Sequence, residues 1–546
     1  MTLSIGILCD SFYFKKWQEE IISYIIKHPE LELKLLVIND KQSDSGFRFK
    51  NFGYKLLTYI DRKIFHVKHD VFTVSNREDL KNTTNTLYVK GRKLKFGVEF
   101  QKEEVDEIKN YHLDVLIRFG FGIIKGDILK AAKYGAWSLH HGDNKVNRGG
   151  PPAFWELVNR EPVTGITLQR LSADLDGGSV IRKSFIQTNS TSFYRNQNSA
   201  YWAGVELFTS ALEDLCKEKL DFSEIHNIKT LPESPFFSMF YSNPLYKNPT
   251  NLRALKIFSS FWSRRIGELF NEKVFTPTWS ISYKYLKNNS IEQSLFRYKK
   301  LKAPNGFEWA DPFVVANVDG YYLFFEELET KIGKAHISYL KFDNYGRLKS
   351  SIPVKVLEES FHLSYPFVFE IKGQYFMMPE AAGSNEIWIY KCVEFPDKWE
   401  KYHKIFSGKE FYDPTLFYHN NMWYLFGTEK HNIGSSRDQY LNIYYSRDLF
   451  GNKWTPHPGN PVTRDVRGAR PAGKIFEWKD RWIRPGQIGA PKYGYGIQFN
   501  EIIKLSETEY EEIPVDSILP LFSDGLTAVH TINFEKGFSV IDSQGI

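Results

Sequence analysis

The C-terminal half of the chain repeats one pattern four times, and this repeat limits the possible folds more than any other feature. Each repeat has a polar residue before a proline, then an apolar strand, a turn and a second, aromatic strand. The steps between successive prolines are 54, 48 and 57 residues, at Pro312, Pro366, Pro414 and Pro471. This spacing fits one four-stranded blade per repeat. With a weaker fifth repeat over 525–542 and a closing strand near residue 280, the sequence predicts a five-bladed β-propeller over 277–546.

In such a propeller the first strand of each blade lines the axis, so polar residues beside the prolines should meet at one mouth. The residues expected there are Asp311, His362, Asp413 and Arg470, with Glu327, Glu380, Gln487 and His530 close behind. Two carboxylates about 5–10 Å apart suffice for glycoside hydrolysis, but Ser364 and Arg470 interrupt a hydrolase-like pattern. The mixed charges favour a pocket for a sugar, a phosphate or a glycan, with Arg470 as the anion contact. The alternative is that Asp311 and Asp413 only cap turns before proline.

The N-terminal region has a different pattern. Residues 3–10 and 32–40 are apolar strands, and residues 15–28 between them have apolar side chains at helical spacing. This β-α-β order predicts a parallel sheet with right-handed crossovers, as in a Rossmann-like domain. No G-x-G-x-x-G follows the first strand, so nothing indicates a dinucleotide. The pattern over 41–95 is weak and predicts no defined element, whereas a helix predicted over 199–219 closes the domain.

Two strings carry the chemistry of this domain. GAWSLHHGDNKVNRGGPP, residues 135–152, places His140 at the end of a strand and before a polar loop. TGITLQRLSADLDGGSVI, residues 164–181, ends a strand-rich run at Asp176. An imidazole and a carboxylate at neighbouring strand ends form an acid/base unit, in which the carboxylate orients the ring and stabilises its charged form. The alternative is a core histidine and a turn aspartate before glycine.

Residues 113–188 resemble the catalytic half of the 10-formyltetrahydrofolate-dependent formyltransferases. The matching features, in the family's order, are a strand, Gly135, His140, Arg148-Gly149, Pro152, the strand TGITL and Leu175-Asp176-Gly177-Gly178. The resemblance implies that His140 and Asp176 are catalytic and that the stretch from Asp174 to Gly178 approaches the pterin of 10-formyltetrahydrofolate. It also implies that the loop after His140, with His141, Asn144 and Arg148, shapes the substrate side.

One position departs from that family. Ser138 stands where the family has the asparagine of Asn-x-His, whose amide is thought to donate to the developing oxyanion. Loss of such a donor typically lowers the rate by about 10²–10³. The shorter hydroxyl of Ser138 can also donate, and Asn144 is a possible substitute from the loop. We therefore expect Ser138 to be part of the catalytic set.

The repeats also resemble a known module, the propeller domain at the amino terminus of glucosamine inositol phosphorylceramide transferases. The matching strings are WADPF, FFEE, HLSYPFVFE, YDPTLF, WTPHPGNPV, RPAG, RPGQ and VHT, and the resemblance covers essentially 277–546. More distantly, the plan is that of five-bladed glycoside hydrolases and fructosyltransferases. The resemblance implies a sugar-associated domain.

An ordered connector is expected over 221–276, because flexible linkers are poor in the Phe and Tyr that it contains. Within it, 249–271 predicts an amphipathic helix whose apolar residues fall on one face: Leu252, Leu255, Phe258, Trp262 and Ile266. Basic residues beside Trp and Phe are also typical of a membrane-surface helix. The two predicted domains cover 1–220 and 277–546. We favour a helix that packs between them.

Composition narrows the class of partner. A formal charge of +6 over 546 residues does not call for a nucleic acid. Cys9, Cys216 and Cys392 have no ligand-like spacing, so no metal is expected and a reducing compartment is indicated. No stretch reaches about 18 apolar residues, and no signal peptide is evident. These features predict a cytoplasmic enzyme without a transmembrane segment.

The sequence therefore predicts a formyltransferase that modifies the amine of an amino sugar. We expect this sugar to be nucleotide-linked and destined for a bacterial surface polysaccharide such as O-antigen. Formyl transfer would use 10-formyltetrahydrofolate as donor. The acceptor class rests on the fusion to a sugar-associated propeller, which is an association. Two alternatives remain. One is a repurposed scaffold that transfers a glycosyl or other acyl group, with the propeller as the site for a glycan or glycolipid acceptor; the other is a sugar-binding protein without turnover.

Overall fold

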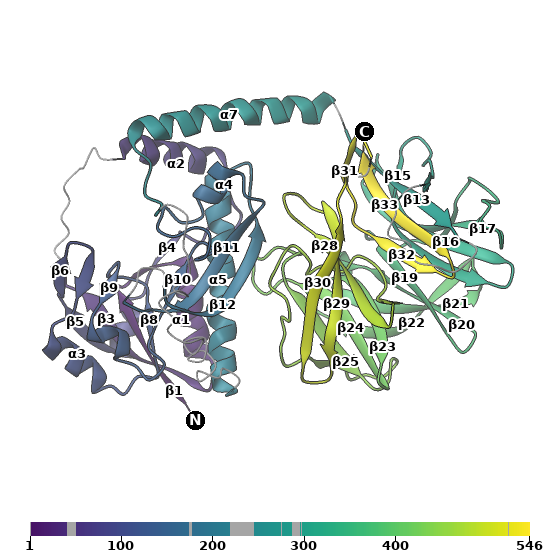
Figure 1. The fold of residues 1–546 in the computed structure, drawn as a ribbon. Coiled ribbons are helices and arrows are strands. Elements are labelled where there is room, and N and C mark those ends of the chain that lie inside the picture. The colour runs from purple at the N-terminus through teal and green to yellow at the C-terminus, as the bar shows by residue number, and fades with distance from the viewer. Residues whose placement is uncertain are drawn as a thin grey trace. The chain divides into compact units, whose positions relative to one another are not determined.

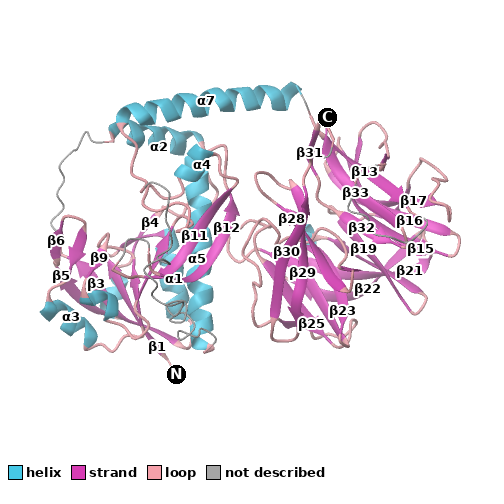
Figure 2. Cartoon of the chain, viewed as in Figure 1, coloured by secondary structure: helices cyan, strands magenta, loops and turns pink. Residues whose placement is uncertain are grey.

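The computed structural model describes residues 2–40, 51–173, 177–218, 245–274, 276–286, 295, 297–521 and 523–545. It divides into two compact units (Figures 1 and 2). Unit 1 comprises Met1–Ile266 with Asn432–Ser435, and unit 2 comprises Gly267–His431 with Ser436–Ile546. The division falls inside a helix, α7 (Asn251–Val274), within the stretch expected to be a connector. Residues 219–244 of that stretch lie outside the described residues.

Unit 1 is built on a seven-stranded sheet of order β12-β11-β10-β8-β1-β3-β5. The strands are β1 (Leu3–Cys9), β3 (Leu31–Asn39), β5 (Asn85–Val89), β8 (Val115–Arg118), β10 (Ala136–His140), β11 (Val163–Arg170) and β12 (Ser179–Gln187). The first five are mutually parallel, and β11 and β12 are antiparallel. All of β1 is buried, as expected for a parallel strand covered on both faces. This is the predicted Rossmann-like arrangement.

Short strands and helices complete the unit. Two small sheets pair β2 (Tyr13–Lys15) with β4 (Val74–Asn76), and β7 (Gly97–Glu99) with β6 (Arg92–Leu94) and β9 (Ile124–Lys125). The predicted first helix is found as α1 (Lys16–Lys27), which buries Trp17, Ile21, Ile22 and Ile25. The other helices are α2 (Phe52–Ile64), α3 (Lys102–Lys109), α4 (Trp155–Asn159) and α5 (Phe193–Cys216).

Two helices differ from the sequence prediction. Helix α5 begins six residues earlier than expected, because Ser192 caps it by accepting a hydrogen bond from the Arg195 amide. Helix α2 lies in the stretch where no element was predicted. It buries only Leu57 and Asp61, so its sequence lacks the broad core-facing stripe that identifies a packed helix.

Helix α7 packs through only part of its predicted apolar face. Phe258 and Trp262 of that face pack, with Phe261, in a buried cluster of unit 1. The other three predicted residues, Leu252, Leu255 and Ile266, are 67%, 62% and 64% exposed. The helix therefore rests on unit 1 through its aromatic residues and exposes aliphatic ones.

Unit 2 contains five antiparallel sheets. Four of them have four strands each, and every predicted repeat supplies the first hairpin of a sheet. These strands are β15 (Phe307–Asn317), β16 (Gly320–Glu329), β17 (Lys334–Phe342), β18 (Val354–Leu357), β19 (Ser364–Ile371), β20 (Gln374–Glu380), β21 (Glu386–Glu394), β22 (Lys398–Ser407), β23 (Phe411–His419), β24 (Met422–Glu429), β25 (Leu441–Ser446), β26 (Thr455–Pro456), β27 (Phe476–Trp478), β28 (Arg481–Ile488), β29 (Gly496–Leu505) and β30 (Tyr510–Ile518).

The fifth sheet joins the two ends of the unit. Its strands are β13 (Thr278–Tyr285), β14 (Lys299–Lys300), β31 (Leu526–Ala528), β32 (Ile532–Glu535) and β33 (Phe538–Gly545). Strand β13 pairs with β33 along its whole length, from Thr278 opposite Gly545 to Tyr285 opposite Phe538. The strand expected near residue 280 thus pairs with the last hairpin of the chain.

Candidate functional sites

His140 and Ser138 lie on β10 in unit 1. On the neighbouring antiparallel strand, Ser138 is opposite Gln169 and His140 is opposite Thr167. Because side chains alternate along a strand, residues 138 and 140 point to the same face of the sheet. Both are buried. The fold therefore places two of the predicted catalytic side chains together at the carboxyl end of a parallel strand, where α/β sheets bind ligands.

Arg118, which the sequence analysis did not identify, contacts Ser138. It ends β8, the strand beside β10. Its Nε and Nη2 atoms donate hydrogen bonds to Ser138 Oγ over 3.0 and 2.6 Å. The serine hydroxyl is thus the acceptor for a cation at the position where the formyltransferase family has an amide. A charged side chain at the end of a buried strand was the available sequence signal.

The loop after β10 lies tightly over His140. His140 Nε2 is 2.7 Å from the carbonyl oxygen of Asn147. Because a carbonyl oxygen only accepts, Nε2 carries a proton in this arrangement. A Cβ atom added at Gly142 would lie 2.9 Å from the same nitrogen, so only glycine allows this approach without a shift.

The loop is held from outside by the segment around Tyr246. The amide of Tyr246 donates to the Arg148 carbonyl over 2.9 Å, and the Gly150 amide donates to the Tyr246 carbonyl over 3.1 Å. The Tyr246 ring stacks on Trp155, with centroids 5.0 Å apart. Arg148 also bonds within the loop, since its Nε donates to the Asn144 carbonyl over 2.8 Å.

Several buried polar atoms around His140 find no hydrogen-bond partner among the described residues. They are both amide atoms of Asn144, Oδ1 of Asn147, Oε1 of Gln169 and Nε2 of His141. Buried polar groups are nearly always paired, and leaving one unpaired costs about 1–3 kcal/mol. Such a concentration beside one histidine indicates a place where a polar ligand, water or residues outside the described set supply the missing bonds.

A cavity of about 350 Å³ is lined by Gln169 and by Arg118, the partner of Ser138, whereas His140, Asn144 and Asn147 are not among its lining residues. Arg118, Gln169 and Lys125 contribute polar groups, and Phe96, Ile123 and Leu171 form apolar wall. Mostly apolar walls with a few polar groups are typical of a site for a small organic ligand. Ser172 and Ala173 also line it. The predicted residues Asp174 and Asp176 lie outside the described residues.

His141 lies in an apolar environment. Its ring stacks on Tyr201 at 3.7 Å between centroids. Burial, together with the nearby charges of His140 and Arg118, lowers the pKa of His141 to about 3. The ring is therefore neutral at physiological pH, and most of its surroundings are those of a packing residue.

Glu156 is a second residue that the sequence analysis missed. It lies on α4 and is only 2% exposed. Burial raises the pKa of its carboxyl to about 7, against the opposing influence of its own backbone amide, Asn147 and His140. A buried glutamate that titrates near neutrality beside a histidine is a candidate for a functional role. Its position within an apolar helix gave no sequence signal.

The candidate site of unit 2 is a cavity of about 480 Å³. Of the residues predicted to converge there, the cavity is lined by Asp311, His362, Glu380, Arg470 and His530. Asp413 lies behind this lining and is bonded to Arg470, and Gln487 donates to Asp413 over 2.7 Å. Glu327 is placed elsewhere: it accepts hydrogen bonds from Trp309 and Ser338, while its neighbour Glu326 lines the cavity. The alternation of side chains along β16 accounts for this shift of one residue.

Arg470 is the centre of a buried ionic network. It contacts Asp413 over 2.6 Å, Asp438 over 2.9 Å and Glu380 over 3.1 Å. Burial raises the pKa of Glu380 well above its usual range, despite the opposing charge of Arg470. Burial acts in the same direction on Asp413, but the charge of Arg470 and its hydrogen bonds lower the pKa of that carboxyl. The predicted anion contact is therefore already saturated by carboxylates of the same unit.

A second buried group surrounds His530. His530 Nδ1 lies 2.6 Å from Asp542 Oδ2, and Trp279 stacks on the ring at 4.1 Å. Burial favours the neutral ring, but Asp542 and Asp311 raise the pKa of His530 to about 9. Burial also favours the neutral form of Asp311, which for a carboxyl group means a higher pKa, of about 8.

Three residues that precede the repeat prolines have left-handed backbone conformations. The φ angles are 49° for Asp311, 45° for Tyr365 and 48° for Asp413. Each falls at a register shift in the first hairpin of its sheet. Non-glycine residues adopt this conformation at an energetic cost and are often found at functional sites. Asp311 and Asp413 are thus more than simple turn caps.

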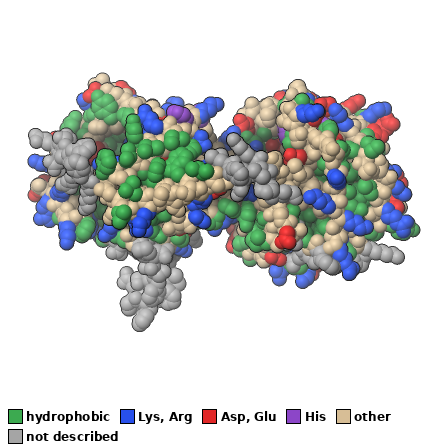
Figure 3. Space-filling model, turned by 90° about the horizontal axis from the view of Figure 1, so that it is seen from above, with side chains coloured by type: hydrophobic (Ala, Val, Ile, Leu, Met, Phe, Trp, Pro, Cys, Tyr) green, Lys and Arg blue, Asp and Glu red, His purple; other side chains and the backbone are tan. Residues whose placement is uncertain are grey.

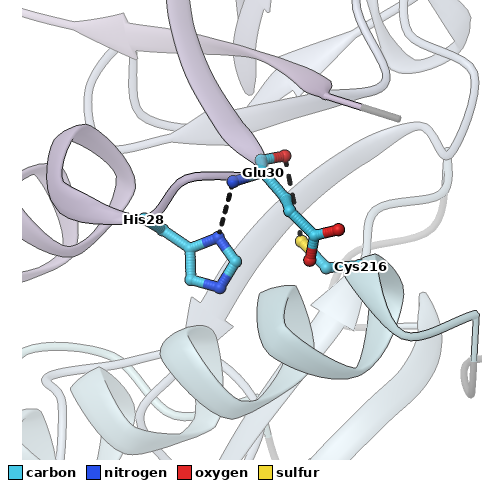
Figure 4. A group of neighbouring side chains, drawn as sticks. All are labelled: His28, Glu30 and Cys216. Carbon is cyan, nitrogen blue, oxygen red and sulfur yellow. Dashed lines mark hydrogen bonds between the residues drawn. The ribbon is translucent and has the colours of Figure 1, made fainter.

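The described residues also contain two clusters of potential metal ligands. Asp311, His530 and Asp542 have ligand atoms within 4.8 Å of one another. However, Asp542 already accepts the amides of Asp311, His530 and Thr531. The other cluster is His28, Glu30 and Cys216 in unit 1 (Figure 4). There the Glu30 amide donates to His28 Nδ1 over 3.2 Å, and burial raises the pKa of the Cys216 thiol to about 11. Neither cluster offers a ready set of metal ligands.

Comparison with known proteins assigns different relatives to the two ends of the chain. Residues 295–531 match the sequence profile of the family described as glucosamine inositolphosphorylceramide transferase 1, N-terminal. The transferase of that name from Oryza sativa subsp. japonica is 32% identical over 209 residues, which cover 38% of this chain and 28% of the rice protein. The chain therefore spans little more than a quarter of that relative.

Formyltransferases match the N-terminal part. The bifunctional polymyxin resistance protein ArnA from Wigglesworthia glossinidia brevipalpis is 26% identical over 249 residues, 43% of this chain and 36% of that protein. Among solved structures, an N-formyltransferase from Helicobacter canadensis covers 40% of this chain and 66% of its own, at 14% identity and a TM-score of 0.25. That likeness supports no inference about activity. The methionyl-tRNA formyltransferase of Bacillus subtilis is 23% identical over 221 residues, 40% of this chain and 62% of that protein, so relatives named as transferases match both parts of the chain. No helix in the described part of the chain is long and apolar enough to cross a membrane.

Proposed function

We propose that unit 1 transfers a formyl group from 10-formyltetrahydrofolate to the amine of a nucleotide-linked amino sugar. The observation that carries the proposal is the set of unpartnered buried polar atoms near His140, one of which, Gln169 Oε1, belongs to a residue that lines a cavity of about 350 Å³ together with Arg118. A donor with a flat polar ring fits an apolar pocket with a few hydrogen-bonding groups. The formyltransferase relatives supply the reaction class, and the surface-polysaccharide setting stays a prediction.

In the proposed reaction the sugar amine attacks the formyl carbon, so that a new C–N bond forms and the bond between that carbon and the donor nitrogen breaks. His140 takes the proton lost by the amine and returns it to the departing donor nitrogen, or it supports the tetrahedral intermediate. Its Nε2 holds a proton against Asn147 in the structure, so Nδ1 is the basic nitrogen of the neutral ring. Asp176 would orient and charge-balance this ring, as the family resemblance implies.

Arg118 and Ser138 together would replace the missing amide. A guanidinium presents several N–H donors in a fixed plane and is always charged. Because Arg118 is held by Ser138 Oγ at the edge of the cavity, its charge would stabilise the negative oxygen that develops during attack. Lys125, on the same cavity wall, is the other cation available to an anionic ligand.

The test is calorimetry with 10-formyltetrahydrofolate, followed by mass spectrometry of reactions with a panel of nucleotide-linked amino sugars. We expect folate binding and a mass increase equal to one formyl group on one member of the panel. If folate does not bind, formyl transfer is wrong, and the glycosyl- or other acyl-transfer and sugar-binding alternatives replace it.

The second candidate function is binding of a sugar or glycan by unit 2. It is supported by the cavity that combines carboxylates with Trp279, Tyr412 and Tyr493, since aromatic faces and hydrogen-bonding groups suit sugar rings. A five-bladed propeller also stays a prediction for this unit. It is supported by hydrogen bonds that link each of the five sheets to the next, through Asp542 and Asp311, Asp311 and Tyr365, Glu380 and Asp413, Arg470 and Asp413, and Ile532 and Ala472.

A further inference from the structure

Helices α2 and α7 of unit 1 lie side by side (Figure 1). The amide of Gly53 on α2 donates to Asn251 Oδ1 on α7 over 3.0 Å. A Cβ atom added at Gly53 would lie 3.4 Å from the Cβ of Ala254. Beyond the end of α2, the ring of Phe65 stacks on Trp262 at 6.2 Å between centroids. The two helices therefore form one layer on this side of the unit.

The inner side of this layer packs, and its outer side does not. Leu57 of α2 and Phe261 of α7 share a buried cluster with Phe154 and Phe193. The outer face consists of six large apolar residues that are between 44% and 67% exposed: Phe52, Leu56, Tyr59, Leu252, Leu255 and Ile266. Contiguous exposed apolar side chains on a folded unit usually mark an interaction site.

The exposed residues follow helical spacing, so they form stripes rather than isolated contacts. On α2 they are three and four residues apart. On α7 the stripe begins with Leu252 and Leu255 and ends with Ile266, and the exposed residues between them are Lys256 and serines. A helix rises 1.5 Å per residue, so the α7 stripe is about 21 Å long. Figure 3 looks down on the side of unit 1 where these helices lie in Figure 1, and hydrophobic side chains gather there beside Lys and Arg.

The charges around the outer face are positive. Exposed basic side chains on the two helices are Lys55, Arg62, Lys63, Arg253 and Lys256. Among the side chains described in α2 and α7, the carboxylates are Asp61, which is buried and bonded to Ser192, and Glu268, which is half-buried. Arg62 is paired with Asp70, beyond the end of α2, over 2.9 Å. No exposed carboxylate among the described side chains of the two helices offsets the other four basic residues.

We infer that the outer face of α2 and α7 is a docking surface for a membrane that carries anionic lipids. Helices that lie in the membrane interface combine an apolar stripe with Lys and Arg, and insert aromatic and aliphatic side chains to a shallow depth. Anionic headgroups attract such basic residues within a Debye length of the surface. The complementary charge favours a lipid surface over a second copy of this face, which would bring like charges together. The inference concerns a surface of unit 1 and does not depend on the proposed formyl transfer.

The test is co-sedimentation of the full chain with vesicles of phosphatidylcholine alone and of phosphatidylcholine with about one third phosphatidylglycerol. We expect binding to the anionic vesicles, weak binding to the neutral ones, and loss of binding in high salt. The combined substitution Leu252→Ser, Leu255→Ser and Ile266→Ser should weaken binding about tenfold or more. The matched control is Val318→Ser, Tyr345→Ser and Ile352→Ser in unit 2, where the replaced side chains are 93%, 70% and 76% exposed. It should bind as the unsubstituted chain does.

A fluorescent label separates insertion from simple electrostatic adsorption. An environment-sensitive dye on Leu255→Cys should shift to the blue with anionic vesicles, whereas the same dye on Val318→Cys should not. No binding to anionic vesicles, or equal losses in the test and control variants, would overturn the inference. A dimer in solution that the triple substitution on α7 dissociates would also overturn it and would assign the face to a second copy.

Discussion

The two candidate sites differ in how their buried polar groups are satisfied. In unit 1, amide and imidazole atoms around His140 have no hydrogen-bond partner among the described residues. In unit 2, Arg470 is surrounded by three carboxylates, and Asp311 accepts hydrogen bonds from Tyr365 and Thr531. The first site lacks bonds that a ligand supplies, whereas the charged groups of the second are paired with one another. In the second site the amide oxygen of Gln487 is a buried atom without a hydrogen-bond partner among the described residues.

This difference assigns a catalytic role to the residues around His140 and a structural role to the network around Arg470. An incomplete polar site is destabilising until a ligand completes it, so its residues should affect activity more than stability. A buried ionic network loses much of its stability when one member is removed, because the remaining charges are left uncompensated. The cavity of unit 2 is then a preformed surface whose shape the network maintains. The predictions below test this assignment.

The largest effect is expected from His140→Ala in the proposed formyl-transfer assay. General acid–base catalysis contributes about 10²–10⁴ in rate, so turnover should fall by that factor. A melting temperature close to that of the unsubstituted chain, measured alongside turnover, would assign the loss to catalysis, as the contrast between the two sites requires. If His140→Ala loses its folded structure together with its activity, His140 is a structural residue like Arg470.

The next effect is expected from Arg470→Leu. Removal of one partner from a buried ion pair typically costs about 3–5 kcal/mol, and here Asp413, Glu380 and Asp438 all lose their cation. Scanning calorimetry should show a lower transition temperature.

The matched control is Arg481→Leu, whose side chain is 56% exposed and pairs with Glu501. Surface pairs contribute about 0–1 kcal/mol, so this variant should melt as the unsubstituted chain does. Equal melting of the two variants would mean that the network does not stabilise unit 2, and the contrast between the sites would fail.

Glu156→Gln tests the electrostatics of the first site. The pKa of Glu156 is raised to about 7 from 4.5, so the folded chain holds this proton more tightly than the unfolded chain. Its contribution to the free energy of unfolding is fully present below pH 4.5 and is lost as the pH rises through 7, a change of about 3 kcal/mol.

The unsubstituted chain should therefore lose thermal stability between pH 5 and pH 8, and Glu156→Gln should lose less. Glu103→Gln, a substitution of an exposed residue on α3, is the control and should follow the unsubstituted chain. Identical pH profiles for all three proteins would place the pKa of Glu156 in its usual range.

The sequence predicted the repeated hairpins of unit 2 and the parallel sheet of unit 1, because both depend on local periodicity and turn residues. It did not predict α2, since the apolar residues of that helix mostly face solvent. In the sites, His140 and Arg470 were identifiable from their positions at strand ends. Glu156 was not, and Arg118 gave only the signal of a charge at the end of a buried strand, because the importance of both depends on neighbours that are distant in the sequence. Glu327 was predicted to line the cavity, but its neighbour Glu326 lines it. A shift of one residue along a strand moves a side chain to the opposite face of the sheet.

The smallest effect is expected from Ser138→Ala. This change removes the hydroxyl that accepts two hydrogen bonds from Arg118, while the guanidinium keeps its contact with the Gly122 carbonyl. The guanidinium of Arg118 then remains in the site, but its orientation is fixed by fewer hydrogen bonds. Turnover should therefore fall about tenfold, as expected for the loss of a hydrogen bond to a charged group. The KM for the donor should change less than kcat, because the contact matters most when the negative oxygen develops. Unchanged kinetics would show that Arg118 does not depend on Ser138, and a loss as large as that of His140→Ala would make the serine itself the principal donor.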